Sequence, residues 1–364
     1  MSFDSLDDEQ KGLFLDIACF FVGMDQDLPI KILEGCSFFP KSGMGVLARR
    51  CLVRIDSDNQ LAMHDLIQDM GREIVRQESC REPGERSRLW CHEDVLDVLI
   101  NNTGTRLVEG LALNLPRSNE PELDAKVFAG MSRLRLLHLS NVHLIGSYEC
   151  LSRRLVWLCW KSFQLKCIPS TLYMDNMVAI DFSYSSLEEV WRETKVLKKL
   201  KYLNLSHSYF LTKTPDFTGL RSLEILLLNH CTKLVEVDQS IGCLKNLLVL
   251  NMKNCQNLCK LPRSMFLLKC LVHLDISVCS KLGGSAVMSW YSSFSSLVSL
   301  TRSPDSIGLS PASILGSSCI LKLYLENCNM SYMPSEIGSL VSLECLNLSR
   351  NKISNLPASL AFLN

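Results

Sequence analysis

Aliphatic and variable positions alternate in a recurring pattern through the second half of the chain. The unit reads aliphatic residue, two variable residues, aliphatic, one variable residue, aliphatic, two variable residues and cysteine, and it begins at Leu223, Leu247 and Leu271. Side chains of a strand point alternately to opposite faces, so the closely spaced aliphatic pair predicts a short strand with one buried face. The cysteine then marks a turn, and a variable segment returns the chain to the next strand.

The spacing of these units is that of a leucine-rich repeat array. Units begin 21 to 24 residues apart, with one gap of 49, at Leu134, Leu155, Met177, Leu200, Leu223, Leu247, Leu271, Ile320 and Leu343. The gap spans two periods and predicts one degenerate repeat at 283–319, although its many serines favour a solvated loop insertion. We therefore predict an α/β fold in which residues 108–364 form a solenoid of about ten repeats, truncated at its C-terminus. A solenoid presents a curved parallel sheet to partners, which favours recognition over catalysis.

Residues 1–80 have the apolar periodicity of helices. Helices are expected from Asp7 to about residue 22, at 29–34 and at 44–51, followed by a hairpin at 52–63 and a longer helix that opens at His64. The apolar face expected of that last helix consists of Leu66, Ile67, Met70, Ile74 and Val75. Three helices and a hairpin predict a mostly α winged-helix domain. Residues 81–107 are expected to be a linker with a short helix at 92–100, and a strand at 108–115 to start the solenoid.

Charge is divided unevenly along the chain, although its net value is zero. Residues 1–110 hold 20 acidic and 12 basic residues, and residues 111–364 hold 18 and 26, so the two parts carry −8 and +8. Opposite charge suggests that the two parts contact each other. A negative winged helix also argues against nucleic-acid binding, because phosphate neutralisation by basic residues supplies most of that affinity. A DNA-binding winged helix nevertheless stays as an alternative.

The cysteines and the N-terminal residues bear on the compartment. Of the 17 cysteines, four share one repeat position, where a buried thiol acts as a small apolar side chain: Cys231, Cys255, Cys279 and Cys328. No metal-binding spacing accompanies them, so no metal site is predicted. The N-terminus lacks the pattern of a signal peptide, and no apolar run is long enough to span a membrane. We expect a cytoplasmic protein, with the nucleus as a second location, and no membrane contact.

Three motifs, in order, resemble those of plant nucleotide-binding leucine-rich-repeat immune receptors of the class with an N-terminal TIR domain. They are Phe14-Leu-Asp-Ile-Ala-Cys-Phe-Phe21 in the first helix, Met63-His-Asp65 after the hairpin and Gly84-Glu-Arg-Ser-Arg-Leu-Trp90 in the linker. The resemblance covers essentially the whole chain and implies the C-terminal part of a disease resistance protein. Neither a TIR domain nor a G-x-x-x-x-G-K-[ST] phosphate loop occurs in these 364 residues. We therefore expect no enzymatic activity of this chain.

The resemblance also implies a nucleotide-sensing role for Met63, His64 and Asp65. In relatives the histidine approaches the β-phosphate of ADP and helps to hold the inactive state, and a helix N-terminus suits such an anion. Asp65 is expected to cap the helix. ADP or ATP is accordingly the cofactor implied for the full-length receptor, whereas this chain alone is expected to hold neither.

Two surfaces are predicted from these arguments. A basic edge would hold the acidic winged helix and keep the receptor inactive, and it consists of Arg192, Lys195, Lys198, Lys199 and Lys201. Outward strand positions would bind a pathogen effector or a guarded host protein, and the candidates are Tyr202, Asn204, His207, Asn229, His230, Asn251, Lys253, Asn254, His273 and Asp275. Oligomers are expected only of the activated full-length receptor. A free-standing repeat scaffold for protein interactions is the alternative from another class.

Overall fold

A computed structural model of the chain describes residues 3–116, 122–282, 319–333 and 335–363. The chain forms two compact units. The first comprises Met1–Phe163, Pro169–Asp181 and Lys199–Tyr202, and it holds the helical N-terminal part together with the first strands of the repeats. The second comprises Gln164–Ile168, Phe182–Lys198 and Leu203–Asn364, which are later repeats.

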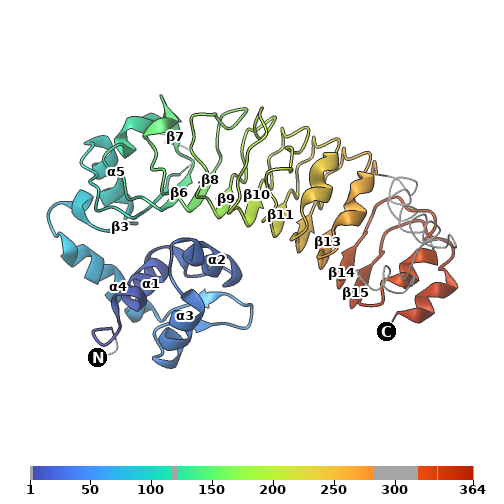
Figure 1. The fold of residues 1–364 in the computed structure, drawn as a ribbon, viewed down its shortest axis with the longest axis horizontal. Coiled ribbons are helices and arrows are strands. Elements are labelled where there is room, and N and C mark those ends of the chain that lie inside the picture. Colours follow the sequence, from blue (N-terminus) through green and yellow to red (C-terminus); the bar gives the residue numbers. More distant parts are fainter. Residues whose placement is uncertain (1–2, 117–121, 283–318, 334, 364) are drawn as a thin grey trace, which may run out of the picture. The chain divides into compact units, whose positions relative to one another are not determined.

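The N-terminal part of the first unit is a winged helix (Figure 1). Its elements are α1 (Asp8–Asp16), the π-helix η1 (Ile17–Phe21), α2 (Asp27–Gly35), α3 (Pro40–Arg49), β1 (Arg54–Ile55), β2 (Leu61–Ala62) and α4 (Asp65–Glu78). The predicted hairpin is confirmed, since β1 and β2 pair antiparallel. Asp7 caps α1 by accepting a hydrogen bond from the backbone N–H of Gln10 at 2.8 Å. The third helix begins at Pro40, earlier than expected, because proline suits the first helical turn.

Helix α4 packs through a narrower face than its sequence predicts. Gly71 and Val75 are buried, and a Cβ on Gly71 would lie 2.9 Å from atoms of Phe14 and Ala18, so the helix approaches α1 closely. Leu66 and Met70, which we expected on the buried face, are 73% and 36% exposed. Residues four apart share one side of a helix. Gly71 and Val75 therefore form the side that packs on the core, and Leu66 and Met70 form another side that faces away from it.

The sheet begins inside the segment predicted to be a linker. This segment contains the 3₁₀ turn η2 (Pro83–Glu85), β3 (Arg88–Leu89) and α5 (His92–Ile100), and it leads into β4 (Gly110–Asn114). Strand β3 pairs in parallel with β4, Arg88 opposite Gly110. The predicted start of the solenoid at residue 108 is therefore too late, because a two-residue strand is too short to show an alternating pattern.

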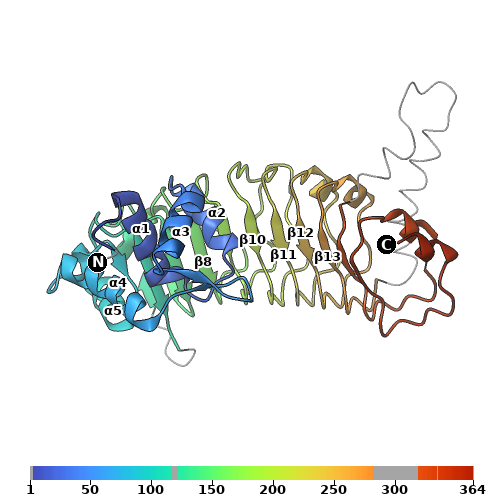
Figure 2. The ribbon, with the colours of Figure 1, turned by 90° about the horizontal axis from the view of Figure 1, so that it is seen from below.

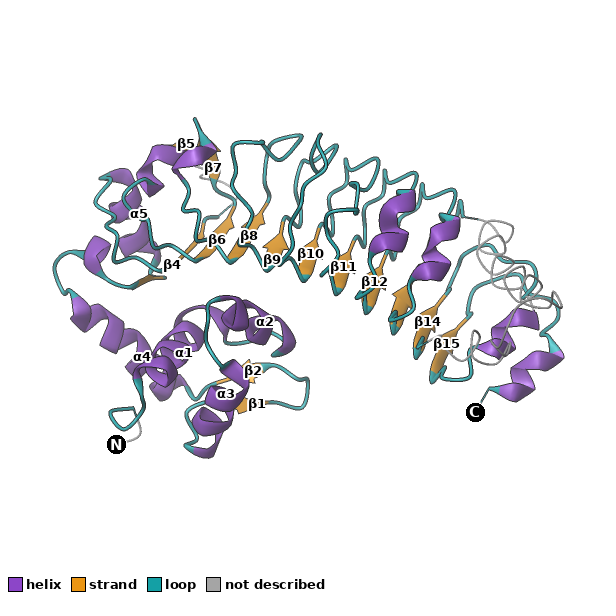
Figure 3. Ribbon diagram, viewed as in Figure 1, coloured by secondary structure: helices purple, strands orange, loops and turns teal. Residues whose placement is uncertain are grey.

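Each repeat contributes one short parallel strand, and the strands follow one another in chain order (Figure 3). They are β6 (Leu136–Ser140), β8 (Trp157–Lys161), β9 (Ala179–Asp181), β10 (Tyr202–Asn204), β11 (Ile225–Leu227), β12 (Val249–Asn251), β13 (His273–Asp275), β14 (Lys322–Tyr324) and β15 (Cys345–Asn347). The first aliphatic residue of nearly every repeat, such as Leu134, Leu223 and Leu247, is fully buried. The predicted parallel sheet of a leucine-rich repeat fold is confirmed.

Strand β13 pairs directly with β14, with His273 opposite Lys322. The degenerate repeat predicted at 283–319 lies almost entirely outside the described residues. Hydrogen bonds from the backbone N–H of Ile276 to Tyr324 and of Leu321 to Val272 leave no place between the two strands. The two strands are therefore direct neighbours in the sheet, and the degenerate repeat at 283–319 stays a prediction.

The return arms carry short 3₁₀ helices and one two-stranded sheet. The described elements are β5 (Glu122–Asp124), η3 (Ala125–Phe128), β7 (His143–Ile145), η4 (Tyr148–Cys150), η5 (Gln239–Cys243), η6 (Arg263–Leu267), η7 (Ser335–Ser339) and η8 (Ala358–Phe362). At the turns, the buried thiols of Cys231 and Cys255 donate to the carbonyl oxygens of Leu205 and Leu228, both at 3.2 Å. The inward position predicted for these cysteines is confirmed. Among the helices that the structure describes, none has the length and apolarity needed to cross a membrane.

Candidate functional site

The first residue of each repeat strand faces outward, and its exposure divides the sheet into two parts. Five consecutive positions are buried: Gly110, Leu136, Trp157, Ala179 and Tyr202. The next five are half-buried or exposed: Ile225, Val249, His273, Lys322 and Cys345. We call β4, β6, β8, β9 and β10 the covered strands, and β11 to β15 the open strands.

Helices of the winged helix lie on the covered strands within the first unit (Figure 2). The ring centroid of Phe21 lies 5.2 Å from that of Trp157 on β8. A Cβ on Gly110 would lie 2.5 Å from the ring of Phe20, so only glycine lets η1 approach β4 this closely. A Cβ on Gly35 would lie 2.5 Å from Val178, which brings the end of α2 onto β9. These contacts explain why both faces of β8 are buried.

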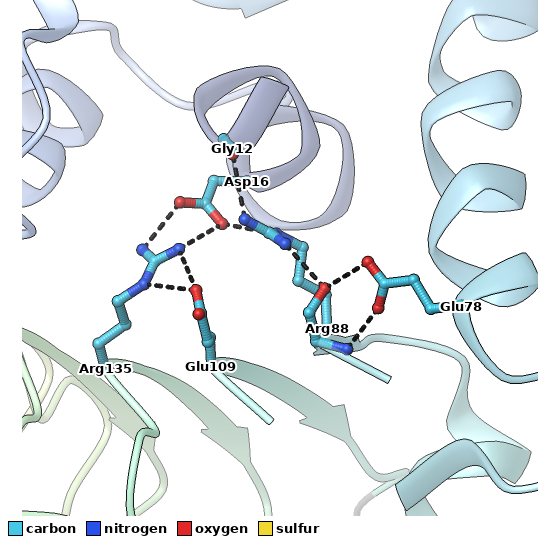
Figure 4. A network of polar contacts seen from close by, with 7 residues as sticks. Gly12, Asp16, Glu78, Arg88, Glu109 and Arg135 are labelled. Carbon is cyan, nitrogen blue, oxygen red and sulfur yellow. Dashed lines mark hydrogen bonds and ion pairs between the residues drawn. The ribbon is translucent and has the colours of Figure 1, made fainter. Parts of the chain in front are cut away.

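A buried charged cluster joins α1 to the first strands (Figure 4). We call Asp16, Arg88, Glu109 and Arg135 the Asp16 cluster. The carboxylate of Asp16 is fully buried and accepts hydrogen bonds from Arg88 Nε at 2.7 Å and from Arg135 Nη2 at 3.0 Å. Arg135 also donates to Glu109 from the neighbouring strand, at 3.2 Å from Nε and 3.1 Å from Nη2. Two arginines from the repeat side thus neutralise one carboxylate of the winged helix.

The contacts around Arg88 extend the cluster to α4. Arg88 donates to the hydroxyl of Ser87 at 2.8 Å and to the carbonyl oxygen of Gly12 at 3.2 Å. Ser87 in turn donates to the carboxylate of Glu78, from its backbone N–H at 2.6 Å and from its hydroxyl at 2.8 Å. Both α1 and α4 are therefore tied to the segment around β3.

The electrostatics of the cluster follow from burial and pairing. Burial alone would raise the pKa of Asp16, but the guanidinium groups of Arg135 and Arg88 outweigh it, so the pKa is lowered. On the covered face, burial and the nearby Lys161 lower the pKa of His138 to about 4. Asp16 is thus ionised and His138 neutral at physiological pH, and the interface contains a fixed arrangement of charge.

The residues of the predicted basic edge contact different partners and do not form one common contact with the winged helix. Lys201 Nζ lies 3.4 Å from Glu34 on α2, which is a contact with the winged helix. Lys199 Nζ donates to Asn176 at 2.8 Å, and Arg192 Nε pairs with Glu189 at 3.0 Å within its own turn. The remaining members, Lys195 and Lys198, are half-buried and exposed. The buried acid–base contact lies instead in the Asp16 cluster, which the sequence analysis did not assign.

His64 is exposed at the start of α4 and is itself the cap of that helix. Its Nδ1 accepts a hydrogen bond from the backbone N–H of Leu66 at 3.3 Å. Asp65 occupies the first helical turn, so its predicted role as the cap is wrong; the turn from strand to helix comes one residue earlier. Met63 is buried beneath them at 7% exposure.

The predicted ligand face includes residues that stabilise their own turns. Tyr202 is 9% exposed and belongs to the covered strands, so it is not an open ligand position. The side chains of Asn204, Asn251 and Asp275 accept hydrogen bonds from backbone N–H groups two residues on, at Ser206, Lys253 and Ser277. Asn229 accepts from the hydroxyl of Ser206 at 2.6 Å. Such bonds hold the chain as it leaves each strand.

A column of side chains follows the strands in the second unit. Tyr184, His207 and His230 have left-handed backbones at equivalent repeat positions. Their rings stack at centroid distances of 4.4 Å for both neighbouring pairs. His230 Nδ1 lies 2.8 Å from Asn254 Nδ2, which continues the column. Of the predicted ligand residues, His207, His230 and Asn254 are thus brought together, while Lys253 is exposed and His273 packs its ring 5.3 Å from that of Tyr324.

Comparison with known proteins agrees with the motifs of the sequence. Residues 7–79 match the winged-helix domain of Roq1-like disease resistance proteins. The TMV resistance protein N of Nicotiana glutinosa is 37% identical over 243 residues, which cover 67% of this chain and 21% of that protein. The disease resistance protein RPP2A of Arabidopsis thaliana is 38% identical over 250 residues, covering 66% and 19%. Over about two thirds of its length, the chain is similar to plant disease resistance proteins. The predicted resemblance is confirmed, and the chain spans about a fifth of the length of these relatives.

Among solved structures, a leucine-rich-repeat protein of Leptospira interrogans matches 74% of this chain and 72% of its own. The two share 22% sequence identity and a TM-score of 0.44.

The Asp16 cluster left only a partial signal in the sequence. Asp16 is the one charged residue between Gly12 and Val22, and a charge in an apolar helix requires a buried partner. Arg88 lies in the linker motif at 84–90. Arg135 and Glu109 carry no comparable signal, because a charged residue at the edge of a strand is ordinarily solvated.

Proposed function

We propose that this chain forms the closed-state contact of a nucleotide-switched plant immune receptor. In this account the covered strands hold the winged helix, and the open strands bind a pathogen effector or a guarded host protein. The observation that carries the proposal is the fully buried Asp16, paired with Arg88 and Arg135. Its relatives are named for disease resistance, which supports the immune role.

The closed state would be held by both packing and charge. Removing one partner from a buried ion pair costs about 3–5 kcal/mol, because the other charge is left unpaired in a poorly solvating environment. Separation of the winged helix from the sheet would instead expose the whole cluster to water, together with Phe21 and Trp157. A ligand that favours the separated state must therefore compensate for the lost apolar contact as well as for the lost pairing.

His64 is proposed to face the β-phosphate of ADP in the longer receptor. Its Nδ1 accepts the amide of Leu66, so the neutral ring carries its proton on Nε2, where it can donate outward to an anion. The start of α4 adds the partial positive charge of a helix N-terminus. Exposed Leu66 and Met70 lie on the same helix and would pack against the part of the receptor that holds the nucleotide. Such a receptor would work in the cytoplasm and oligomerise only when activated.

Charge reversal of Arg135 in a receptor that contains this chain tests the proposal. We expect Arg135→Glu to cause defence signalling without a ligand, because Asp16 and Glu109 would then repel the substituted side chain. Arg221→Glu, an equal charge change at an exposed repeat position, is the matched control and should leave signalling at its basal level. Basal signalling from an Arg135→Glu receptor that accumulates normally would refute the closed-state role.

A second test addresses the nucleotide. His64→Ala should speed the release of prebound ADP from the purified full-length receptor, because the outward donor is lost. Arg54→Ala, an exposed residue of the hairpin, serves as the control. Equal release rates for the two variants would remove His64 from the nucleotide site.

A further inference from the structure

A cavity of about 510 Å³ lies within the first unit, beside the Asp16 cluster. Residues 35–38, at the end of α2, line one side. The other side is lined by residues that precede the covered strands, among them Arg133, Arg154 and Lys199. We call these three residues the basic column. Arg135 also lines the cavity, so one guanidinium borders both the cavity and the buried cluster.

The basic column follows from the repeat register. Leu136, Trp157 and Ala179 are paired neighbours in the sheet, and the repeat spacing places Arg133, Arg154, Asn176 and Lys199 at equivalent positions. Neighbouring parallel strands are about 4.8 Å apart, so the two arginines arise from backbones within one strand spacing of each other. Like charges at directly neighbouring strand positions repel. A bound anion would therefore reduce the repulsion between the charges of the basic column.

The acidic residue in the cavity wall is already engaged. Glu109 accepts two hydrogen bonds from Arg135. Lys199 Nζ bonds to the neutral amide of Asn176, and neither Arg133 nor Arg154 has a carboxylate partner among the described residues. With Arg135 and Arg88 balanced by Asp16 and Glu109, the basic column leaves three uncompensated positive charges.

The winged-helix side of the cavity adds no carboxylate. Its residues are Gly35, Cys36, Ser37 and Phe38. The end of α2 is closed by its own backbone hydrogen bonds. The N–H groups of Cys36, Ser37 and Phe38 donate to the carbonyl oxygens of Ile32, Glu34 and Leu33, so these carbonyl oxygens already have donors. The hydroxyl of Ser37 remains as a neutral group that can donate or accept.

We propose that this cavity binds a small anion with several linked phosphate groups. Arginine pairs with phosphate oxygens through two parallel N–H donors, which suits it to this chemistry. Two arginines on neighbouring repeats, followed by Asn176 and then Lys199 on the next two, match an extended multivalent anion better than a single phosphate. The bound anion would contact both the winged helix and the repeats, and it would stabilise the first unit by mass action.

Calorimetric titration of the whole chain with tripolyphosphate tests the proposal at low ionic strength. We expect one binding site per chain, and at least ten-fold weaker binding for Arg133→Ala and for Arg154→Ala. Arg154→Lys should retain part of the affinity, since it keeps the charge but loses the paired donors. Arg221→Ala removes an equal charge from an exposed later repeat position and should bind like the unmodified chain.

Further measurements distinguish recognition of linked phosphate groups from general attraction between opposite charges. Inorganic phosphate should bind at least ten-fold more weakly than tripolyphosphate, and citrate should not match tripolyphosphate. Saturating tripolyphosphate should raise the midpoint of thermal unfolding of the chain and of Arg221→Ala, but not that of the Arg133→Ala/Arg154→Ala double variant. Equal affinity of all variants, or equal binding of citrate, would overturn the proposal, as would the absence of binding by a folded chain.

Discussion

Strands β8 and β13 come from the same repeat pattern but differ in what their outward side chains do. On β8, Trp157 and Cys159 face outward and are buried beneath the winged helix. On β13, His273 and Asp275 occupy the equivalent positions and are only half-buried. The inward residues of both strands, such as Leu158 and Leu274, are fully buried alike. The inward residues of the two strands are thus equally buried. The outward residues are buried only where that part of the sheet already has a partner.

The kind of outward residue differs only in part between the two sets. The covered strands begin with Gly110, Leu136, Trp157, Ala179 and Tyr202, and the open strands begin with Ile225, Val249, His273, Lys322 and Cys345, so aromatic residues occur only in the first set and a charged residue only in the second. An apolar or aromatic residue facing outward on a solenoid strand exposes a patch that favours association. In this chain the covering partner is the winged helix of the same unit.

The largest expected effect is at Trp157. We expect Trp157→Ala to lower the free energy of unfolding by about 3–5 kcal/mol, because it empties a large volume between β8 and Phe21. Lys322→Ala changes the equivalent position on an open strand and should stay within about 0.5 kcal/mol. Urea unfolding of the two variants measures the contrast. Similar losses at both positions would remove the distinction between covered and open strands.

The next effect concerns the buried carboxylate. Asp16→Asn should cost about 3 kcal/mol at neutral pH, because two guanidinium groups lose their shared counter-charge. Glu236→Gln, which breaks the exposed pair with Lys260, is the control and should not change stability measurably.

The cost of Asp16→Asn should depend on pH in one direction. The pKa of Asp16 is lowered in the folded chain, so its stabilisation is complete above the unfolded value of about 3.9 and is lost as the pH falls through the folded value. The stability difference between the chain and the variant should thus be constant above about pH 4 and shrink below it. A difference that shrinks already between pH 7 and pH 5 would show that another group carries the contact.

A smaller effect is expected where the backbone approaches the sheet. Gly35→Ala should cost about 1–3 kcal/mol, since the added Cβ would lie 2.5 Å from Val178 and 2.7 Å from Val156. Gly45→Ala is the matched control, because that Cβ meets nothing closer than 3.5 Å and alanine favours the helix. Thermal unfolding should separate the two, and equal midpoints would argue against close packing of α2 on the covered strands.

The smallest effect lies on the second unit. Burial, and then the neighbouring ring of His230, lower the pKa of His207. The unfolded histidine takes up its proton near pH 6.5, so the stability contributed by the stacked column should decline as the pH falls below that value. In an NMR titration, His230→Ala should raise the pKa of His207, whereas His143→Ala should leave it unchanged. A pKa of His207 that ignores His230 would contradict the stacked arrangement.

Repetition and resemblance made most of the fold predictable, and local chemistry limited the rest. The strand of every described repeat starts two residues after its first aliphatic position, from Leu134 and β6 to Leu343 and β15. The order of helices and hairpin in the winged helix was equally visible. The exposed Leu66 was not, because amphipathic spacing does not tell which of two apolar strips finds the core.

The candidate site was less predictable, since it depends on contacts between distant segments. The opposite charge of the two parts predicts an acid–base contact, and the dense basic run around Lys198 and Lys199 predicts the wrong place for it. The buried contact uses Asp16 and Arg135, which are 119 residues apart in the sequence. A dense run of charged residues in a sequence is typical of a solvated surface. A buried ion pair needs only one charged residue from each of two segments, which can be far apart in the sequence.

Footprinting of side chains by hydroxyl radicals, read by peptide mass spectrometry, tests the central claim most directly. Trp157 is 3% exposed beneath the winged helix, and Tyr184 is 44% exposed. We predict that Tyr184 reacts rapidly in the folded chain while Trp157 is protected, and that Asp16→Lys makes Trp157 reactive while Leu274 and its neighbours on β13 stay unchanged. Reaction of Trp157 at the rate of Tyr184 in the unmodified chain would contradict the claim that the winged helix occupies the covered strands.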